Sequence, residues 1–81
     1  MNFIKIKEVQ EIFKDDKHIP VELDVILNLD NITLIRDVII DGETGLNVYL
    51  IGREKAIRVM NSDDIKLIKN KCGLNKIKEV I

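Results

Sequence analysis

Residues 36–52 read RDVIIDGETGLNVYLIG and carry the strongest fold signal in the chain. Two apolar runs flank a polar tip from Asp41 to Gly45, and Asp-Gly is a dipeptide that tight hairpin turns favour. The stretch therefore predicts a β-hairpin, and its tip either carries chemistry or only reverses the chain. We expect a structural turn in which Asp41, Gly42 and Gly45 supply the backbone conformations.

Three carboxylates near this tip, those of Asp37, Asp41 and Glu43, raise the question of a metal-binding loop. Such a loop needs several oxygens that converge on one ion. In a strand, Asp37 and Asp41 share a face but stand about 13 Å apart at 3.3 Å per residue. We therefore expect a turn without a bound metal, and no cofactor in this protein.

Apolar and polar residues alternate on both sides of the hairpin. Residues 21–29, VELDVILNL, alternate as half-buried strands do, with Ile26 among the polar positions, and the Asp30-Asn31 dipeptide suits a tight turn into the next run. Beyond the tip, two more apolar runs, LNVYLI and KAIRVM, are separated by a Gly-Arg-Glu turn. The pattern predicts a four-stranded antiparallel meander over residues 20–61.

The N-terminal segment has two competing periodicities. Residues 5–14, KIKEVQEIFK, place Ile6, Val9 and Phe13 at helical spacing. Isoleucines also alternate with lysines at the start of the chain, so a strand is the alternative there. We expect an N-terminal helix and loop over residues 1–19, because Pro20 disfavours helical geometry in the residue before it.

Residues 62–73, SDDIKLIKNKCG, change to a helical period. Ser62 is a suitable N-cap, and the two aspartates after it lie where the helix dipole is positive. Gly73 would end this helix. The last eight residues, LNKIKEVI, fit either a short helix or a strand, and we treat residues 62–81 together as a C-terminal helical segment.

Several apolar side chains fall on the second face of the predicted strands, where an open sheet would leave them in water. They are Ile26, Ile35, Ile39, Tyr49, Ile51 and Met60. A closed barrel with contacts to other copies would cover them. The expected fold is mainly β: one domain over residues 1–81, in which the meander closes into a small SH3- or Sm-like barrel with flanking helices.

Length and composition indicate an ordinary small globular domain. The chain has 81 residues, of which 46% are apolar and 33% charged. A single cysteine, Cys72, excludes an internal disulfide and suits a reducing compartment. The N-terminus lacks the features of a signal peptide, and no apolar run is long enough to span a membrane. We expect a soluble cytoplasmic protein.

The net charge of −1 hides an uneven distribution. Residues 21–45 hold one base and six acids, a sum of −5, and residues 46–81 hold eight bases and four acids, a sum of +4. A basic surface suits phosphate, although the fold could also interleave and cancel these charges. Arg53, Lys55 and Arg58 are the preferred contacts, and further lysines could join them, namely Lys66, Lys69, Lys71, Lys76 and Lys78.

The sequence offers no constellation for catalysis. His18 and Cys72 are the only imidazole and the only thiol, and nothing in their spacing supports a nucleophile pair. A glycine-rich phosphate loop, a nucleophile elbow and a zinc-binding spacing are all absent from the 81 residues. We therefore expect that the protein is not an enzyme.

Three short stretches match a known pattern: Val9-Gln10 in the predicted first helix, PVEL at residues 20–23, and DIKLI at residues 64–68. Over residues 6–68 the chain resembles the Sm-like barrel of the bacterial RNA chaperone Hfq, most closely its divergent cyanobacterial members. The resemblance implies a homo-oligomer that binds RNA, with Gln10 among its contacts. It also implies a strand over residues 65–68.

Residues 35–45, IRDVIIDGETG, resemble the PRC-barrel signature, which runs V-x-D-V-x-I-D-x-E-T-G. PRC-barrels are protein-interaction modules, so this resemblance implies an adaptor function. Both resemblances imply a small antiparallel barrel without a catalytic site.

Our leading hypothesis is a non-enzymatic, homo-oligomeric binding module that engages RNA. A protein–protein adaptor is the alternative, and a small regulatory or immunity-type inhibitor is compatible with the size of the chain. No membrane partner is expected.

Overall fold

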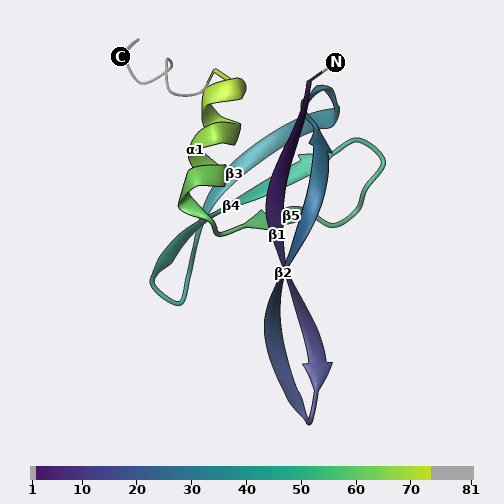
Figure 1. Ribbon diagram of the computed structural model, residues 1–81, viewed down its shortest axis with the longest axis vertical. Coiled ribbons are helices and arrows are strands. Elements are labelled where there is room, and N and C mark those ends of the chain that lie inside the picture. The colour runs from purple at the N-terminus through teal and green to yellow at the C-terminus, as the bar shows by residue number, and fades with distance from the viewer. Residues whose placement is uncertain (1, 74–81) are drawn as a thin grey trace.

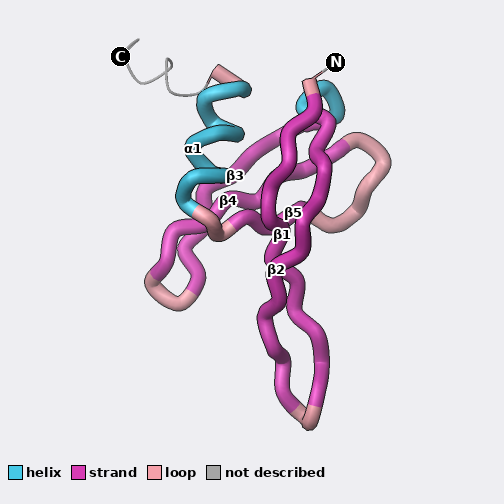
Figure 2. Tube along the Cα trace, in the orientation of Figure 1, coloured by secondary structure: helices cyan, strands magenta, loops and turns pink. Residues whose placement is uncertain are grey.

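In a computed structural model, residues 2–73 are described, and they form two antiparallel sheets, one 3-10 turn and one α-helix (Figure 1 and Figure 2). One sheet is a two-stranded hairpin, and the other has three strands in the order β3-β4-β5. In chain order the elements are β1 (Phe3–Lys14), β2 (Lys17–Asn28), η1 (Leu29–Asn31), β3 (Ile32–Ile40), β4 (Glu43–Leu50), β5 (Ile57–Val59) and α1 (Ser62–Lys71).

The predicted N-terminal helix is wrong, because residues 3–14 form strand β1 and pair with β2 from Phe3↔Asn28 to Lys14↔Lys17. The alternation of Ile4 and Ile6 with lysines prevails over the helical spacing further along. Asp15 and Asp16 adopt positive φ angles of 52° and 60°, which makes them a two-residue hairpin turn. The turn brings β1 and β2 side by side, so that their backbones form hydrogen bonds with each other. A helix over residues 5–14 could not form these bonds between strands.

The predicted closed barrel and continuous meander are also wrong for the described residues, since both sheets are open. The chain does not reverse tightly at Asp30-Asn31. It makes the 3-10 turn η1, in which the Asn28 side chain accepts a hydrogen bond from the Asp30 N–H at 3.0 Å. β2 therefore pairs with β1 and not with β3, although β1 also lies beside β5.

The core lies where the base of the hairpin, the three-stranded sheet and α1 meet. Each of these pieces has an apolar face that needs the others to bury it. Eight residues form this core: Ile6, Leu27, Leu46, Val48, Ile57, Val59, Ile65 and Ile68. The mainly β composition and the presence of a helix after residue 61 are confirmed.

Helix α1 runs from Ser62 to Lys71, so the strand that the Hfq resemblance implies over residues 65–68 is not formed. Asn61, and not Ser62, is the N-cap: its side chain accepts a hydrogen bond from the Asp64 N–H at 3.0 Å. Gly73, whose φ of 75° suits glycine, directly follows the C-cap residue Cys72. The expectation for LNKIKEVI, residues 74–81, lies outside the described residues.

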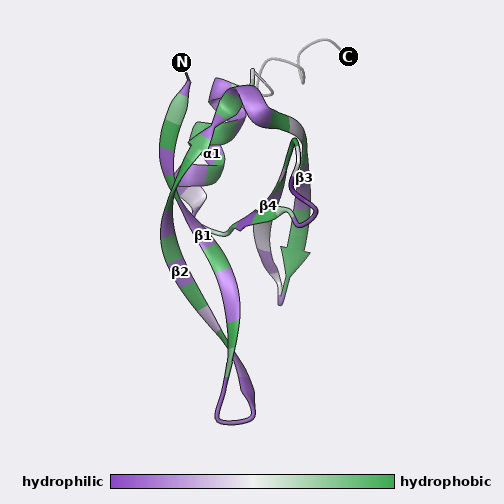
Figure 3. Ribbon diagram, turned by 90° about the vertical axis from the view of Figure 1, so that its right-hand side faces the viewer, coloured by the Kyte–Doolittle hydropathy of each residue, from purple (hydrophilic) through white to green (hydrophobic). Residues whose placement is uncertain are grey.

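The outer half of the β1–β2 hairpin projects from the body of the molecule, as the views in Figure 1 and Figure 3 both show. We name residues 9–22 the arm. Every residue from 10 to 20 is exposed, including Phe13 at 66%.

Toward the base of the hairpin, Lys7 donates a 3.0 Å hydrogen bond to Asp24, and this bond lowers the pKa of Asp24 and raises the pKa of Lys7. What Asp24 adds to stability is thus lost as the pH falls through its lowered pKa.

The β3–β4 turn is shorter than the polar tip suggests. Asp41 and Gly42, with φ angles of 51° and 81°, form a two-residue turn between Ile40 and Glu43. Gly45 belongs to β4, is buried and does not have a positive φ. It is needed for a different reason: a Cβ at this position would overlap the sulfur of Met60.

We predict that Gly45→Ala lowers the free energy of unfolding by about 1–3 kcal/mol, the usual cost of overpacking. Chemical denaturation of four proteins tests the cause: wild type, Gly45→Ala, Met60→Ala and the double variant. Most of the penalty should disappear in the Met60→Ala background. An equal penalty in both backgrounds would show that Met60 is not the reason for glycine here.

Candidate functional site

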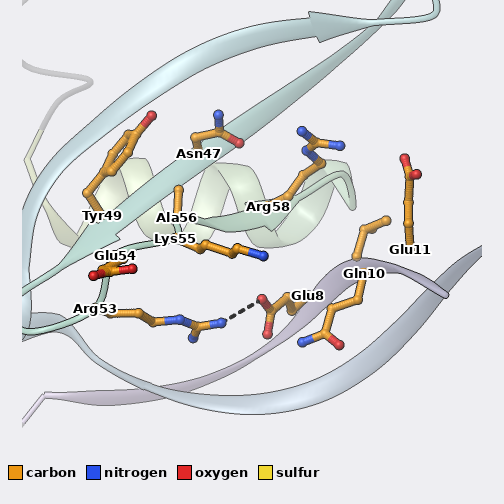
Figure 4. A pocket seen from close by; sticks show the side chains of 11 residues that line it. Glu8, Gln10, Glu11, Asn47, Tyr49, Arg53, Glu54, Lys55, Ala56 and Arg58 are labelled. Atoms are coloured by element: carbon orange, nitrogen blue, oxygen red, sulfur yellow. Dashed lines mark hydrogen bonds and ion pairs between the residues drawn. The ribbon is translucent and has the colours of Figure 1, made fainter.

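A groove of about 820 Å³ lies between the middle of β1, the loop from β4 to β5, and the face of β4 and β5 that points away from α1 (Figure 4). Charged, amide and aromatic side chains line it, together with two small apolar ones. The lining residues are Glu8, Val9, Gln10, Glu11, Asn47, Tyr49, Arg53, Glu54, Lys55, Ala56 and Arg58.

The structure brings together all four residues expected to contact nucleic acid, since Arg53, Lys55, Arg58 and Gln10 line this one groove. Gln10 comes from strand β1 and not from the helix in which it was expected. The lysines of α1 are not among the lining residues, and Figure 4 shows α1 behind the sheet. Lys76 and Lys78 lie outside the described residues.

Glu8 and Arg53 form the wall of the groove nearest the hairpin. Glu8 follows Ile6 on the inward face of β1, and its side chain is only 5% exposed. The Arg53 guanidinium donates a 3.2 Å hydrogen bond to its carboxylate. Burying a carboxylate without a partner costs folding free energy, and the Arg53 guanidinium offsets that cost. The same bond holds the β4–β5 loop against the hairpin.

Arg58 and Lys55 supply the positive charge that is available to a ligand. Within residues 2–73, neither forms an ion pair, whereas Arg53 is matched by Glu8. The Nε of Arg58 is buried and has no hydrogen-bond partner among the described residues. Buried donors are almost always satisfied in folded proteins, so this N–H is an exception.

Tyr49 and Asn47 extend the groove along β4 and were not predicted as site residues. Asn47 pairs with Arg58 across the β4–β5 ladder. The guanidinium carbon of Arg36 lies 5.9 Å from the centre of the Tyr49 ring, so a cation covers part of it. The strand alternation could have placed both residues on the face opposite the core. Glu8 could not be found in this way, because a helix was expected there.

The remaining candidate residues do not assemble into a site. His18 lies next to the arm turn and Cys72 lies at the end of α1, at opposite ends of the molecule (Figure 1). Partial burial raises the pKa of the Cys72 thiol, which disfavours the thiolate. Within residues 2–73 there is no group of three potential metal ligands and no helix able to cross a membrane.

Comparisons with protein-family models, curated proteins and solved structures give no match for this chain.

We predict that Arg53→Ala lowers the free energy of unfolding by about 1–2 kcal/mol. This is less than the 3–5 kcal/mol of a fully buried pair, because the Arg53 side chain is 42% exposed. In a Glu8→Gln background the same change should cost less than about 0.5 kcal/mol, as at an ordinary surface position. Denaturation of the four proteins of this cycle measures the coupling, and a value near zero would contradict the assigned role of the pair.

Proposed function

We propose that this protein is a non-enzymatic binding module that holds a short stretch of single-stranded RNA in the groove. The observation that carries the proposal is the position of Arg58 and Lys55, two cations without an acidic partner in residues 2–73, on one side of a polar groove. Phosphate oxygens are suitable acceptors for both side chains.

The charge of the lining limits how much RNA the groove can hold. Three acids and three bases line it, and the Glu8–Arg53 pair removes one of each from contact with a ligand. A long polyanion would meet Glu11 and Glu54 as well as the two cations. The groove therefore suits one or two phosphates, with modest affinity that depends on salt.

The neutral side chains supply contacts to a base. Tyr49 offers the kind of aromatic ring on which a base stacks, worth about 1–3 kcal/mol per base in proteins of this type. The amides of Gln10 and Asn47 can donate to and accept from base edges. Together these side chains favour an unpaired base over a duplex, whose bases are stacked inside the helix.

We predict that labelled single-stranded RNA binds at low salt and that Arg58→Ala weakens binding about tenfold, the usual effect of losing a charge-assisted contact. If Arg58 and Lys55 each meet one phosphate, the plot of log K against log salt should have a slope of about −1.4. Fluorescence anisotropy over a range of salt concentrations measures both quantities.

Lys66→Ala is the matched control, because it removes one positive charge from an exposed position on α1. It should leave RNA affinity almost unchanged, and circular dichroism should show that both variants fold. The absence of RNA binding at micromolar protein and low salt, or equal losses in the two variants, would reject the proposal.

A protein–protein adaptor is the second candidate, and one observation favours it. The arm holds Ile12, Phe13 and Ile19 in water on a two-stranded ribbon that projects from the body (Figure 3). An isolated ribbon of this kind gains little stability by itself, so apolar side chains in such a place are typical of an interaction surface.

For this adaptor function we predict that Ile12→Thr with Ile19→Thr abolishes binding of a protein partner and preserves the fold, because both side chains lie outside the core. Threonine keeps the β-branched shape that suits strands. A partner identified by affinity capture should bind the purified wild type and not the double variant in a calorimetric titration. Unchanged affinity would exclude the arm as the docking element.

A further inference from the structure

The outer edges of the strands differ in how they are protected. Unpaired strand edges bind other strands, and proteins block them with proline, charge or covering segments. On β2, Pro20 supplies no N–H, and on β1 the Lys7 N–H donates to the Asp64 side chain at 2.9 Å. β5 has only three residues and lies beside β1. Within residues 2–73, the outer edge of the nine-residue strand β3 has no proline, and from Thr33 to Ile40 it makes no backbone hydrogen bond to another element.

The register of the β3–β4 hairpin shows which groups of β3 point outward. Antiparallel pairs alternate between hydrogen-bonded and non-hydrogen-bonded, and the pair that flanks a two-residue turn is hydrogen-bonded. Ile40↔Glu43 flanks the Asp41-Gly42 turn. The backbone groups of Ile35, Asp37 and Ile39 therefore face away from β4. The same rule, applied to the first hairpin, places the Lys7 N–H outward, where it does meet Asp64.

We propose that β3 pairs with β3 of a second copy of this chain, in antiparallel orientation about a two-fold axis at Asp37. This register joins all three outward residues in hydrogen-bonded pairs: Asp37 lies opposite Asp37 of the second copy, and Ile35 lies opposite its Ile39. Two three-stranded sheets then become one six-stranded sheet. With the axis shifted by one residue, the three outward residues of the two copies form only two hydrogen-bonded pairs with each other instead of three.

The exposed apolar side chains of β3 match this pairing. Ile39 is 77% exposed in the single chain, and it would lie beside Ile35 of the second copy. On the other face, Leu34, also exposed, would lie opposite Ile40 of the second copy. Apolar cross-strand pairs of this kind stabilise antiparallel sheets.

The charges at the axis are complementary rather than repulsive. Lys69 on α1 lies 2.7 Å from the Asp37 carboxylate, so each aspartate brings its own cation to the axis. Two aspartates and two lysines would form a cluster of alternating charge. An axis at Arg36 would place two arginines opposite each other, and neither forms an ion pair in residues 2–73. The charges therefore favour the axis at Asp37 over the axis at Arg36.

Sedimentation equilibrium at tens of micromolar should give about twice the 9.3 kDa mass of the chain. Ile39→Lys should raise the Kd of the dimer roughly tenfold or more, because it places a lysine in each of the two Ile35–Ile39 pairs. Ile26→Lys is the matched control: Ile26 is 75% exposed but lies on β2, so the dimer should persist. A monomeric wild type, or equal effects of the two variants, would overturn the proposal.

Amide hydrogen exchange followed by NMR locates the interface independently of mass. In the dimer, the N–H groups of Ile35, Asp37 and Ile39 should exchange at least about tenfold more slowly than in Ile39→Lys. The N–H groups of Leu34, Arg36 and Val38 bond to β4 and should be protected in both proteins. A dimer without this alternation would use another surface. None of these β3 residues lines the groove, so RNA binding can fail or succeed separately.

Discussion

The structure depends on one shared core, to which the β1–β2 hairpin, the three-stranded sheet and α1 each contribute an apolar face. The hairpin contributes Ile6 and Leu27 to the core, the three-stranded sheet contributes four residues, and α1 contributes Ile65 and Ile68. No piece has a second layer of its own, and a two-stranded hairpin or a ten-residue helix is marginal by itself in water. Removing any one piece would expose the apolar faces of the other two, so we expect them to fold as one cooperative unit.

The groove exists because the hairpin passes from the core to solvent along a single strand. On one face of β1, Ile6 is buried in the core, Glu8 is buried but polar, and Gln10 is exposed. On this face of β1, the side chains become polar where the strand leaves the core. The β4–β5 loop meets β1 at this boundary, and the Arg53–Glu8 hydrogen bond fixes it there. A polar site at the margin of the core thus follows from the way the hairpin leaves it.

Local sequence patterns predicted those elements in which one periodicity dominates. The alternation before Asp30, the Asp41-Gly42 turn and the helix after residue 61 all have a single strong signal. In residues 5–14 two periods compete, and the decisive turn at Asp15-Asp16 lacks the usual glycine, so the hairpin was missed. The open architecture depends on η1, whose conformation follows from a side-chain cap that Asn28 makes in the folded chain.

The basic residues of the groove could be predicted by charge, but their positions could not. The basic bias of the second half of the chain indicates Arg53, Lys55 and Arg58, and all three line one groove. Gln10 also lines this groove, but it lies on strand β1, where a helix was expected. Glu8, Asn47 and Tyr49 acquire their places from pairing between strands distant in sequence. No spacing rule within one element reports such pairing.

Asp64 makes two hydrogen bonds, one to the N-cap residue of α1 and one to Lys7, which lies 57 positions earlier in the chain. Its N–H is bound by the N-cap Asn61, and its carboxylate accepts from the Lys7 N–H on the outer edge of β1. During synthesis the first hairpin is complete once residue 28 has emerged, whereas the residue that covers its edge comes 36 positions later (64 − 28 = 36). Until α1 is made and docked, the Lys7 N–H has no such acceptor in the growing chain. The hydrogen bond at this edge is therefore among the last contacts that the chain can complete.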